Sequence, residues 1–368
     1  MLDYLRNKVL NEIGFSKEAY CLTDGFGVSM GGSGLMATSR DFMLFALLIL
    51  NNGKLNGKQY ISADYIKEST SFQTATCVTG PVPSESQGYG LQFWIGEHGS
   101  IVCYGMGGQL AILLPEYNTA IVTTADTQGY QGGNQVIYDA IFRHILPELE
   151  KKKAPWTPTD EEKLAFEQFM SKLAIRPLNH NKSASEAWNN KFENVNDINT
   201  SFLTNFRPIM SSFGGTYVVK RASDAAKTLD KNIINETIWD EISFEMSDPL
   251  TPSAMGKVAL KCHVSPSNTD STVTFEFGFG VLKEGTLNMT THMGNRADEP
   301  VPVSMHYAAS AEWLSENMLY IRVHLLDTSV GSIHIQAVFG ESDVTIFLRK
   351  QEETLFGEFS GHLYGTRQ

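Results

Sequence analysis

The sequence is poor in basic residues and has no long apolar run. It carries 29 Lys and Arg residues against 41 Asp and Glu residues, a net charge of −12 over 368 residues. Nucleic acids and anionic membrane surfaces require clustered Lys and Arg, so neither is expected as a partner. The longest apolar run, 42–50, is far shorter than the roughly 20 residues that span a bilayer. We therefore expect no membrane segment in this chain.

Cysteine is scarce as well. The chain has four cysteines, which lie far apart and form neither a Cys-x-x-Cys pair nor a Cys/His spacing that binds zinc: Cys21, Cys77, Cys103 and Cys262. We expect free thiols and no metal. The glycine-rich loops lack the Walker and dinucleotide-binding patterns, so no cofactor is predicted. Residues 1–6 do not resemble a signal peptide, which predicts a cytoplasmic chain as given, although a longer parent could carry an export signal upstream.

What the sequence does contain is a globular composition, 42% hydrophobic and 19% charged, with enough length for two cores. In its first part, periodicity predicts helices over 2–13, 41–50, 61–69 and 133–150. Gly14 ends the first helix, and Thr38 or Ser39 caps the second. Four strands of an antiparallel meander are predicted over 89–95, 101–104, 109–114 and 120–124. The last helix is expected to face the sheet with Val136, Ile137, Ile141, Ile145 and Leu149.

The clearest boundary is the Pro-rich segment 154–158, after which Thr159 and Glu162 form a capping box for a new helix. Short alternating runs toward the end of the chain predict eight strands, a pattern typical of a barrel or sandwich. The predicted strands are 216–219, 242–245, 258–263, 273–279, 319–325, 333–339, 345–348 and 355–359. The fold class is therefore α+β, with three parts: 1–153, a helical connection over 154–212, and a β-rich accessory domain over 213–368, similar to a lipocalin-like barrel or a sandwich.

Two glycine-rich motifs are the most informative feature of the first part. Gly31-Gly32-Ser33-Gly34 leads into the capped helix, and Tyr104-Gly105-Met106-Gly107-Gly108-Gln109 leads into Leu113-Leu114-Pro115-Glu116. With 52–58 and 89–94 between them, these pieces stand in an order that resembles the C-terminal part of the β-lactamase-related serine hydrolases. That family includes class C β-lactamases, penicillin-binding proteins and esterases, and nylon-oligomer hydrolases.

The resemblance implies an antiparallel sheet with helices on its faces, an acyl-enzyme, and a small-molecule or peptide substrate with an ester, amide or peptide bond. It also implies a nucleophile in Ser-x-x-Lys and a proton shuttle in Tyr-x-Asn, and this sequence has neither. The nearest imitations, 228–231 and 315–317, lie in the β-rich part. In the family's Lys/His-x-Gly motif, the Lys or His position falls on Cys103 or Tyr104, which favours an esterase or amidase over recognition of a β-lactam carboxylate.

On this basis the substrate-binding and oxyanion region is predicted at Tyr104, Gly105, Met106, Gly107, Gly108 and Gln109, and the chain alone is predicted to be inactive. Two alternatives stay open. Gly27-Val28-Ser29-Met30-Gly31 is a literal G-x-S-x-G, which would make Ser29 a nucleophile. The chain could instead be a non-catalytic binding or assembly module on a degenerate hydrolase scaffold. The absent upstream strands also predict an exposed sheet edge and self-association.

Overall fold

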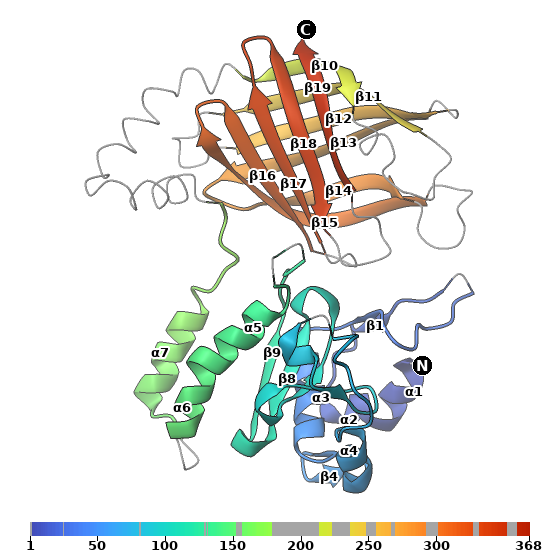
Figure 1. Cartoon of the computed structure of the whole chain (residues 1–368), viewed down its shortest axis with the longest axis vertical. Helices are drawn as coiled ribbons and strands as arrows, with labels where there is room; N and C mark the ends of the chain where they lie inside the picture. The colour runs from blue at the N-terminus through green and yellow to red at the C-terminus, as the bar shows by residue number, and fades with distance from the viewer. Residues whose placement is uncertain are drawn as a thin grey trace. The chain divides into compact units, whose positions relative to one another are not determined.

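The computed structural model describes residues 2–24, 26–80, 82–128, 130, 132–151, 157–178, 213–222, 236–247, 255–265, 269–291, 301–326, 331–351 and 359–368. The chain divides into two compact units, Met1–Gln168 and Phe169–Gln368. The first unit mixes helices with short strands, whereas the second is built almost entirely of strands (Figure 1). An α+β chain with a mainly β second part is what the sequence predicts.

The helices that the described residues form lie in the first unit, except that α7 extends two residues beyond its boundary at Gln168. They are α1 (Leu2–Leu5), the π-helix η1 (Arg6–Leu10), α2 (Asn11–Ile13), α3 (Ser39–Leu50), α4 (Ala63–Ser69), α5 (Gln135–Ala140), the π-helix η6 (Ile141–Ile145), α6 (Leu146–Lys151) and α7 (Asp160–Met170). Short 3₁₀ turns are η2 (Pro83–Glu85), η3 (Glu97–Gly99), η4 (Met106–Gly108) and η5 (Pro115–Tyr117). Two small hairpins pair β1 (Tyr20–Cys21) with β2 (Leu35–Met36) and β3 (Lys54–Leu55) with β4 (Lys58–Gln59).

The predicted meander is present as a five-stranded antiparallel sheet. Its order is β5 (Gly88–Tyr89), β6 (Trp94–Ile95), β7 (Ile101–Cys103), β8 (Leu110–Leu114) and β9 (Thr119–Thr123). The segment predicted as one strand, 89–95, is two strands in the structure. Gln92 has a positive φ of 70°, and the Gly90 N–H donates to the Phe93 carbonyl at 2.7 Å. This tight turn separates β5 from β6.

Helices cover both faces of this sheet. One face packs on α3 and α4 through Ile49, Ile66, Phe93 and Leu113. The other face packs on α5 and η6 through a cluster of buried side chains: Val102, Leu110, Ile112, Tyr138 and Ile141. Successive side chains of a strand point to opposite faces, and both faces of this sheet are covered. All five residues of β8 are therefore buried.

The helix boundaries follow the predicted caps. Thr38 caps α3, with its hydroxyl accepting from the Asp41 N–H at 3.1 Å. Gly14, at φ 86°, ends the first helix in the left-handed conformation. The predicted face of the 133–150 helix is correct only in part. Ile141 is buried and Ile137 packs against the sheet cluster, as predicted. Val136 and Ile145, however, are 42% and 40% exposed, and Tyr138 and Leu146 are buried instead.

The reason lies in the π-helical turn η6. A π turn contains one more residue than an α turn, so the side chains on either side of η6 no longer follow a single 3.6-residue stripe. Pro147 lies two residues after η6 and has no N–H to continue the α-helical hydrogen bonds. The apolar face therefore shifts at η6.

The two edges of the five-stranded sheet differ. At β5, Tyr89 exchanges backbone hydrogen bonds with Thr74, at 2.9 Å and 3.0 Å, so the 73–74 segment covers this edge. On the far side, β9 pairs with β8, and no other described segment forms a bridge with it. Among the described residues, β9 is therefore the edge strand with a single partner.

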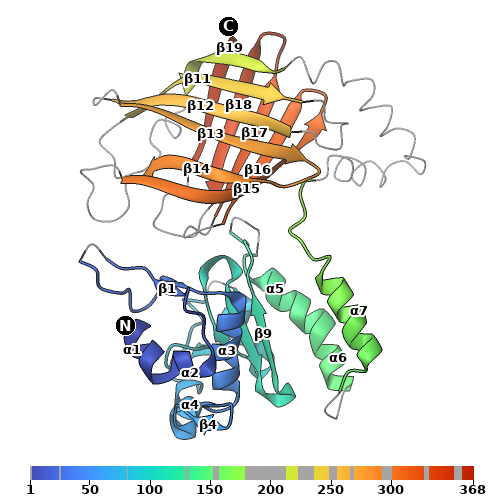
Figure 2. The same cartoon turned by 180° about the vertical axis from the view of Figure 1, so that it is seen from behind.

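The second unit is a ten-stranded antiparallel meander (Figures 1 and 2). Its strands are β10 (Gly215–Ala222), β11 (Glu236–Met246), β12 (Met255–Ser265), β13 (Thr269–Phe279), β14 (Lys283–Thr291), β15 (Val301–Ser315), β16 (Met318–Leu325), β17 (Ser332–Phe339), β18 (Asp343–Gln351) and β19 (Phe359–Arg367). The first strand, β10, pairs with the last, β19. Sequence prediction missed β14 and β15, and the segment predicted as the strand 355–359 precedes β19 and lies mostly outside the described residues.

The ladder of this barrel is interrupted between β13 and β14. β13 and β14 form no ladder with each other. Among the described residues, two side-chain interactions and one short parallel bridge connect the strands on either side of this gap. The Tyr307 hydroxyl on β15 accepts from the Glu276 N–H at 2.8 Å, and Lys283 pairs with the Glu276 carboxylate at 3.3 Å. Gly278 and Phe279 pair in parallel with β15. The sheet thus closes on itself as a barrel.

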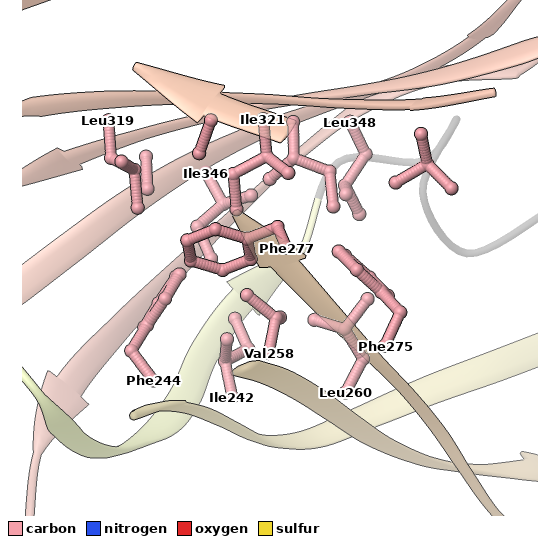
Figure 3. Close-up of a cluster of buried hydrophobic side chains, with 14 of the residues drawn as sticks. Ile242, Phe244, Val258, Leu260, Phe275, Phe277, Leu319, Ile321, Ile346 and Leu348 are labelled. Carbon is pink, nitrogen blue, oxygen red and sulfur yellow. The ribbon is translucent and has the colours of Figure 1, made fainter. Parts of the chain in front are cut away.

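The barrel interior is lined with buried apolar side chains. Figure 3 shows Ile321, Ile346 and Leu348 from one wall opposite Ile242, Val258 and Leu260 from the other, with Phe277 between them. The Phe277 ring occupies the space beside Gly256 on the paired strand, where a Cβ would lie 2.2 Å from the ring. A larger residue at 256 would displace this ring.

The connection between the units is described only in part. The predicted capping box is present at the start of α7, where the Thr159 N–H donates to Glu162 at 2.8 Å and the Glu162 N–H to the Thr159 hydroxyl at 3.2 Å. Most of the predicted boundary segment 154–158 lies outside the described residues. No helix in the described ranges is both long and apolar enough to cross a membrane.

Candidate functional site

The glycine turn between β7 and β8 has a backbone geometry that favours glycine. Gly107 and Gly108 have φ angles of 72° and 92°, in the left-handed region. A Cβ on Gly108 would lie 2.7 Å from the Ile137 side chain and 3.0 Å from that of Ala125. A Cβ on Gly105 would lie 2.7 Å from the Gln109 carbonyl. The turn is therefore closely packed as well as conformationally demanding.

Hydrogen bonds hold the turn to the segment that follows β9. The Thr127 N–H donates to the Gly107 carbonyl at 3.0 Å, and the Thr123 hydroxyl donates to the Gly108 carbonyl at 2.8 Å. The Gln109 amide donates to the Ala125 carbonyl at 2.5 Å. The Gln109 side chain thus braces the turn instead of projecting into solvent.

These bonds orient the peptide groups of the turn. In a trans peptide the N–H points opposite to the C=O. Since the Gly107 and Gly108 carbonyls point toward the 123–127 segment, the N–H groups of Gly108 and Gln109 point away from it. Two successive backbone donors on one side of a glycine turn can bind an oxygen that carries partial negative charge.

A buried polar network lies behind the turn. The Thr127 hydroxyl donates to the Asn134 side chain at 2.7 Å, and Asn134 donates to the Glu85 carboxylate at 3.3 Å. The Tyr138 hydroxyl donates to the same carboxylate at 3.0 Å. Glu85 is fully buried. Burial, and then the nearby Glu85 charge, raise the pKa of Tyr138, so this hydroxyl stays protonated and acts as a donor.

Sequence reasoning did not find this network. Glu85 lies in a short polar segment, Pro83-Ser84-Glu85-Ser86, that reads as an exposed loop. Glu85 is buried because α5, about 50 residues further along the chain, packs against it. The residues next to Glu85 in the sequence therefore do not indicate that it is buried.

Cys103 and Tyr104, the two positions proposed for the Lys or His of the family motif, lie on opposite faces of the sheet. Cys103 packs with the α3 side, where burial raises the pKa of its thiol to about 12. Tyr104 packs with the α5 side and contacts the Trp94 ring at 5.9 Å between centroids. A thiol with this pKa is protonated at neutral pH and is a poor nucleophile.

Ser29 lies apart from this turn in the sequence, in the hairpin formed by β1 and β2. It forms an antiparallel bridge with Thr23, and the Asp24 N–H donates to the Val28 carbonyl at 2.9 Å. The residues after Ser29 form bends and then β2. A nucleophile elbow requires a strand before the serine and a helix directly after it, and the structure has a hairpin there instead.

The other sequence candidates do not gather around the glycine turn. Ser315 and Asn317 form the tight turn between β15 and β16, where the Asn317 amide donates to the Phe339 carbonyl at 2.8 Å. Residues 228–231 lie outside the described residues. The described residues contain no group of three or more His, Cys, Asp or Glu side chains placed to hold a metal. Cys21, Cys77 and Cys103 are free thiols.

Comparison with known proteins gives only distant likenesses. No protein-family model matches the chain, and no curated protein matches it. Among solved structures, it is similar to a Bacillus anthracis protein named as a 6-aminohexanoate-dimer hydrolase, with 27% identity over 41% of this chain and 39% of that one, at a TM-score of 0.34. A Bacteroides dorei protein named as a β-lactamase is 18% identical over 38% of this chain and 50% of that one, at a TM-score of 0.29.

A further likeness covers almost the whole of a smaller protein. As-p18, an extracellular fatty acid binding protein, is 9% identical over 43% of this chain and 97% of its own length, at a TM-score of 0.25. The chain spans half or less of the length of the two hydrolase-named structures. All these TM-scores are too low to establish a shared fold.

Proposed function

We propose that residues 1–153 are the C-terminal portion of a β-lactamase-related serine hydrolase domain, and that the turn 104–109 is its substrate-binding and oxyanion region. The observation that carries this proposal is the orientation of the turn, whose Gly107 and Gly108 carbonyls are held by Thr127 and Thr123. The five-stranded antiparallel sheet with helices on both faces agrees with the arrangement that the glycine motifs imply.

The turn can supply electrostatic stabilisation but no nucleophile. The N–H groups of Gly108 and Gln109 would donate to the carbonyl oxygen of an ester, amide or peptide, where negative charge develops during acyl transfer. Ser-x-x-Lys and Tyr-x-Asn are absent from the sequence, and the Cys103 thiol is held protonated. Without a nucleophile and its base, only binding and oxyanion effects remain, so the chain alone is expected to show no turnover.

The first test measures covalent labelling and turnover. The purified chain is treated with excess fluorophosphonate probe, adducts are mapped by peptide mass spectrometry, and hydrolysis of p-nitrophenyl esters is followed. Ser29→Ala is the matched control. We expect no adduct and the same background hydrolysis in both proteins. A stoichiometric adduct on Ser29, with turnover lost in the Ser29→Ala variant, would overturn the proposal.

A second test examines the turn itself. A small ester or amide is titrated while the backbone amide resonances of Gly108 and Gln109 are observed by NMR. Gly32, whose Cβ position is open, supplies the reference resonance. We expect both turn resonances to move and Gly32 to stay fixed. Saturable binding that shifts only resonances elsewhere would remove the turn as the substrate region.

A second candidate function, a non-catalytic binding module, is favoured by one observation in the barrel. The indole N–H of Trp313 is buried in the apolar interior and has no hydrogen-bond acceptor among the described residues. An unsatisfied buried donor is unfavourable by about 1–3 kcal/mol, which an acceptor atom on a bound apolar molecule would recover. Titration with an environment-sensitive fluorescent fatty acid tests this candidate: saturable binding that weakens in Trp313→Phe supports it, and no binding removes it.

A further inference from the structure

The glycine turn contains a Gly-Gly peptide, which has little conformational preference of its own. Gly107 and Gly108 have no Cβ atoms, so reversing the peptide between them meets no side chain of either residue. The reversed peptide would have its carbonyl outward and the Gly108 N–H inward. The direction of this N–H therefore depends on the group that binds the Gly107 carbonyl.

The Gly107 carbonyl accepts from the Thr127 N–H at 3.0 Å. Thr127 lies in the segment 124–128, which follows β9 and forms neither helix nor strand, so no sheet ladder fixes its position. Its hydroxyl instead donates to the buried Asn134 side chain at 2.7 Å. Asn134 thus holds the residue that holds the turn.

Glu85 fixes the orientation of Asn134. An Asn side chain has one acceptor end and one donor end. The Asn134 oxygen accepts from Thr127, while its NH₂ group donates to Glu85 Oε1 at 3.3 Å. The Tyr138 hydroxyl donates to the same Glu85 oxygen at 3.0 Å. Because these side chains are buried, the direction of each bond is set by the protein and not by solvent.

We propose that Glu85 is a positioning residue for the turn, an inference that rests on the proposed function. Its carboxylate orients Asn134, which holds Thr127. Thr127 in turn keeps the Gly107 carbonyl inward, so that the Gly108 N–H faces the substrate oxygen. Without the carboxylate, the Gly-Gly peptide is free to reverse, and the turn loses one of its two donors.

The second donor of the turn supplies an internal reference. The Gln109 N–H belongs to the peptide whose Gly108 carbonyl accepts from the Thr123 hydroxyl at 2.8 Å. Thr123 lies in β9 and pairs with Leu110 of β8, so the sheet itself fixes its position. Removing the Glu85 carboxylate should therefore change the Gly108 N–H and leave the Gln109 N–H in place.

Three variants of the full chain separate a positioning role from a general loss of stability. Glu85→Leu removes both acceptor oxygens with a side chain of similar size. Glu85→Gln keeps one amide oxygen that can accept from both Asn134 and Tyr138. Glu97→Gln is the matched control, because the Glu97 carboxylate accepts from Ser84, next to Glu85, by a bond that lies outside the network.

In each protein, NMR measures amide hydrogen exchange at position 127 and, as a reference for global stability, at Ile112 in the middle of β8. We expect Glu85→Leu to raise the exchange rate at position 127 about tenfold relative to Ile112, the effect of losing roughly one hydrogen bond. Glu85→Gln and Glu97→Gln should stay within about threefold. With a small ester added, Glu85→Leu should lose the shift of the Gly108 resonance and keep that of Gln109.

Equal acceleration at position 127 and at Ile112 would show a general loss of stability and would overturn the positioning role. A Gly108 shift that is unchanged in Glu85→Leu would overturn it as well. If Glu85→Leu does not fold, Thr127→Val removes the last link of the network at nearly the same shape, and the same two measurements decide. A wild-type chain in which neither turn resonance responds to ester removes the proposed function, and exchange at position 127 then still decides whether Glu85 holds the turn.

Discussion

Replacing Asp41 by Asn is expected to destabilise the first unit by about 2–3 kcal/mol at neutral pH. Asp41 is only 3% exposed, and its carboxylate forms part of the capping box at the N-terminus of α3. It accepts from the Ser16 N–H at 2.6 Å, from the Thr38 N–H at 3.0 Å and from the Thr38 hydroxyl at 2.8 Å. These bonds join the helix start to the loop that follows α2.

The magnitude follows from what Asn retains. Its single amide oxygen can keep one of the acceptor roles, while the NH₂ group meets donors where the carboxylate offered acceptors. Loss of the capping box is worth about 1 kcal/mol. Loss of a charge-assisted bond to a buried N–H adds about 1–2 kcal/mol. For a unit of this size the sum corresponds to roughly 4–12 °C in Tm.

The pH dependence has a definite sign. Burial by itself would raise the pKa of Asp41, but the hydrogen bonds from Ser16 and Thr38 and the nearby Arg6 charge outweigh it and hold the pKa below its usual 3.8. A pKa that is lower in the folded state contributes stability that is complete above about pH 4 and is lost as the pH falls through the folded value. The difference between wild type and Asp41→Asn should therefore shrink in acid.

Calorimetric unfolding of both proteins between pH 7 and pH 3 measures this difference. Asp24→Asn is the matched control, because Asp24 also accepts two backbone N–H groups, at 2.9 Å each, but in an exposed hairpin. We expect the control to change stability by less than about 0.5 kcal/mol. A loss at Asp41 no larger than in the control, or a difference that grows in acid, would refute the reasoning.

Three further outcomes are expected. In urea unfolding, Gly108→Ala should lower the stability of the first unit by about 1–3 kcal/mol, because Gly108 has a positive φ and neighbouring side chains occupy the space of a Cβ. The control Gly32→Ala, where that space is open, should change the stability by less than about 0.5 kcal/mol. Phe277→Ala should cost the barrel about 3–5 kcal/mol in its own urea transition, and a loss below about 1 kcal/mol would contradict the packed interior. At pH 8, iodoacetamide should alkylate exposed Cys77 at least about a hundredfold faster than Cys103, whose pKa is about 12; similar rates on the folded chain would contradict that burial.

The elements that sequence predicts well are those fixed by local chemistry. The Thr38 cap, the Gly14 terminus and the Thr159 capping box each depend on a side chain or φ angle within a few residues, and all three are present. The sequence also predicts the β7–β8 hairpin, because Gly107 and Gly108 mark a turn whose positive φ angles favour glycine.

The features that the sequence does not predict depend on contacts between residues far apart in the chain, or on places where the hydrophobic pattern of a helix or strand is interrupted. At the π turn 141–145 the buried position moves from the predicted Ile145 to Leu146. The sequence does not predict β15 because its small residues, Ala308, Ala309 and Ala311, do not resemble a strand, although all three are buried and the last two lie in the barrel core. The burial of Glu85 requires Tyr138, which the chain brings up only after the sheet is complete.

The pairing of β10 with β19 has a consequence for how the barrel is made. Most ladders in it join strands that are neighbours along the chain and can form as soon as each hairpin exists. The closing ladder joins Tyr217 to Arg367, and Arg367 also donates to the Gly214 carbonyl at 2.6 Å. Closing so long a loop is slow relative to hairpin formation. During synthesis, β10 would therefore be paired with β11 on one side only until β19 emerges from the ribosome. A stop codon before Phe359 would leave one edge of β10 and one edge of β18 without a partner strand.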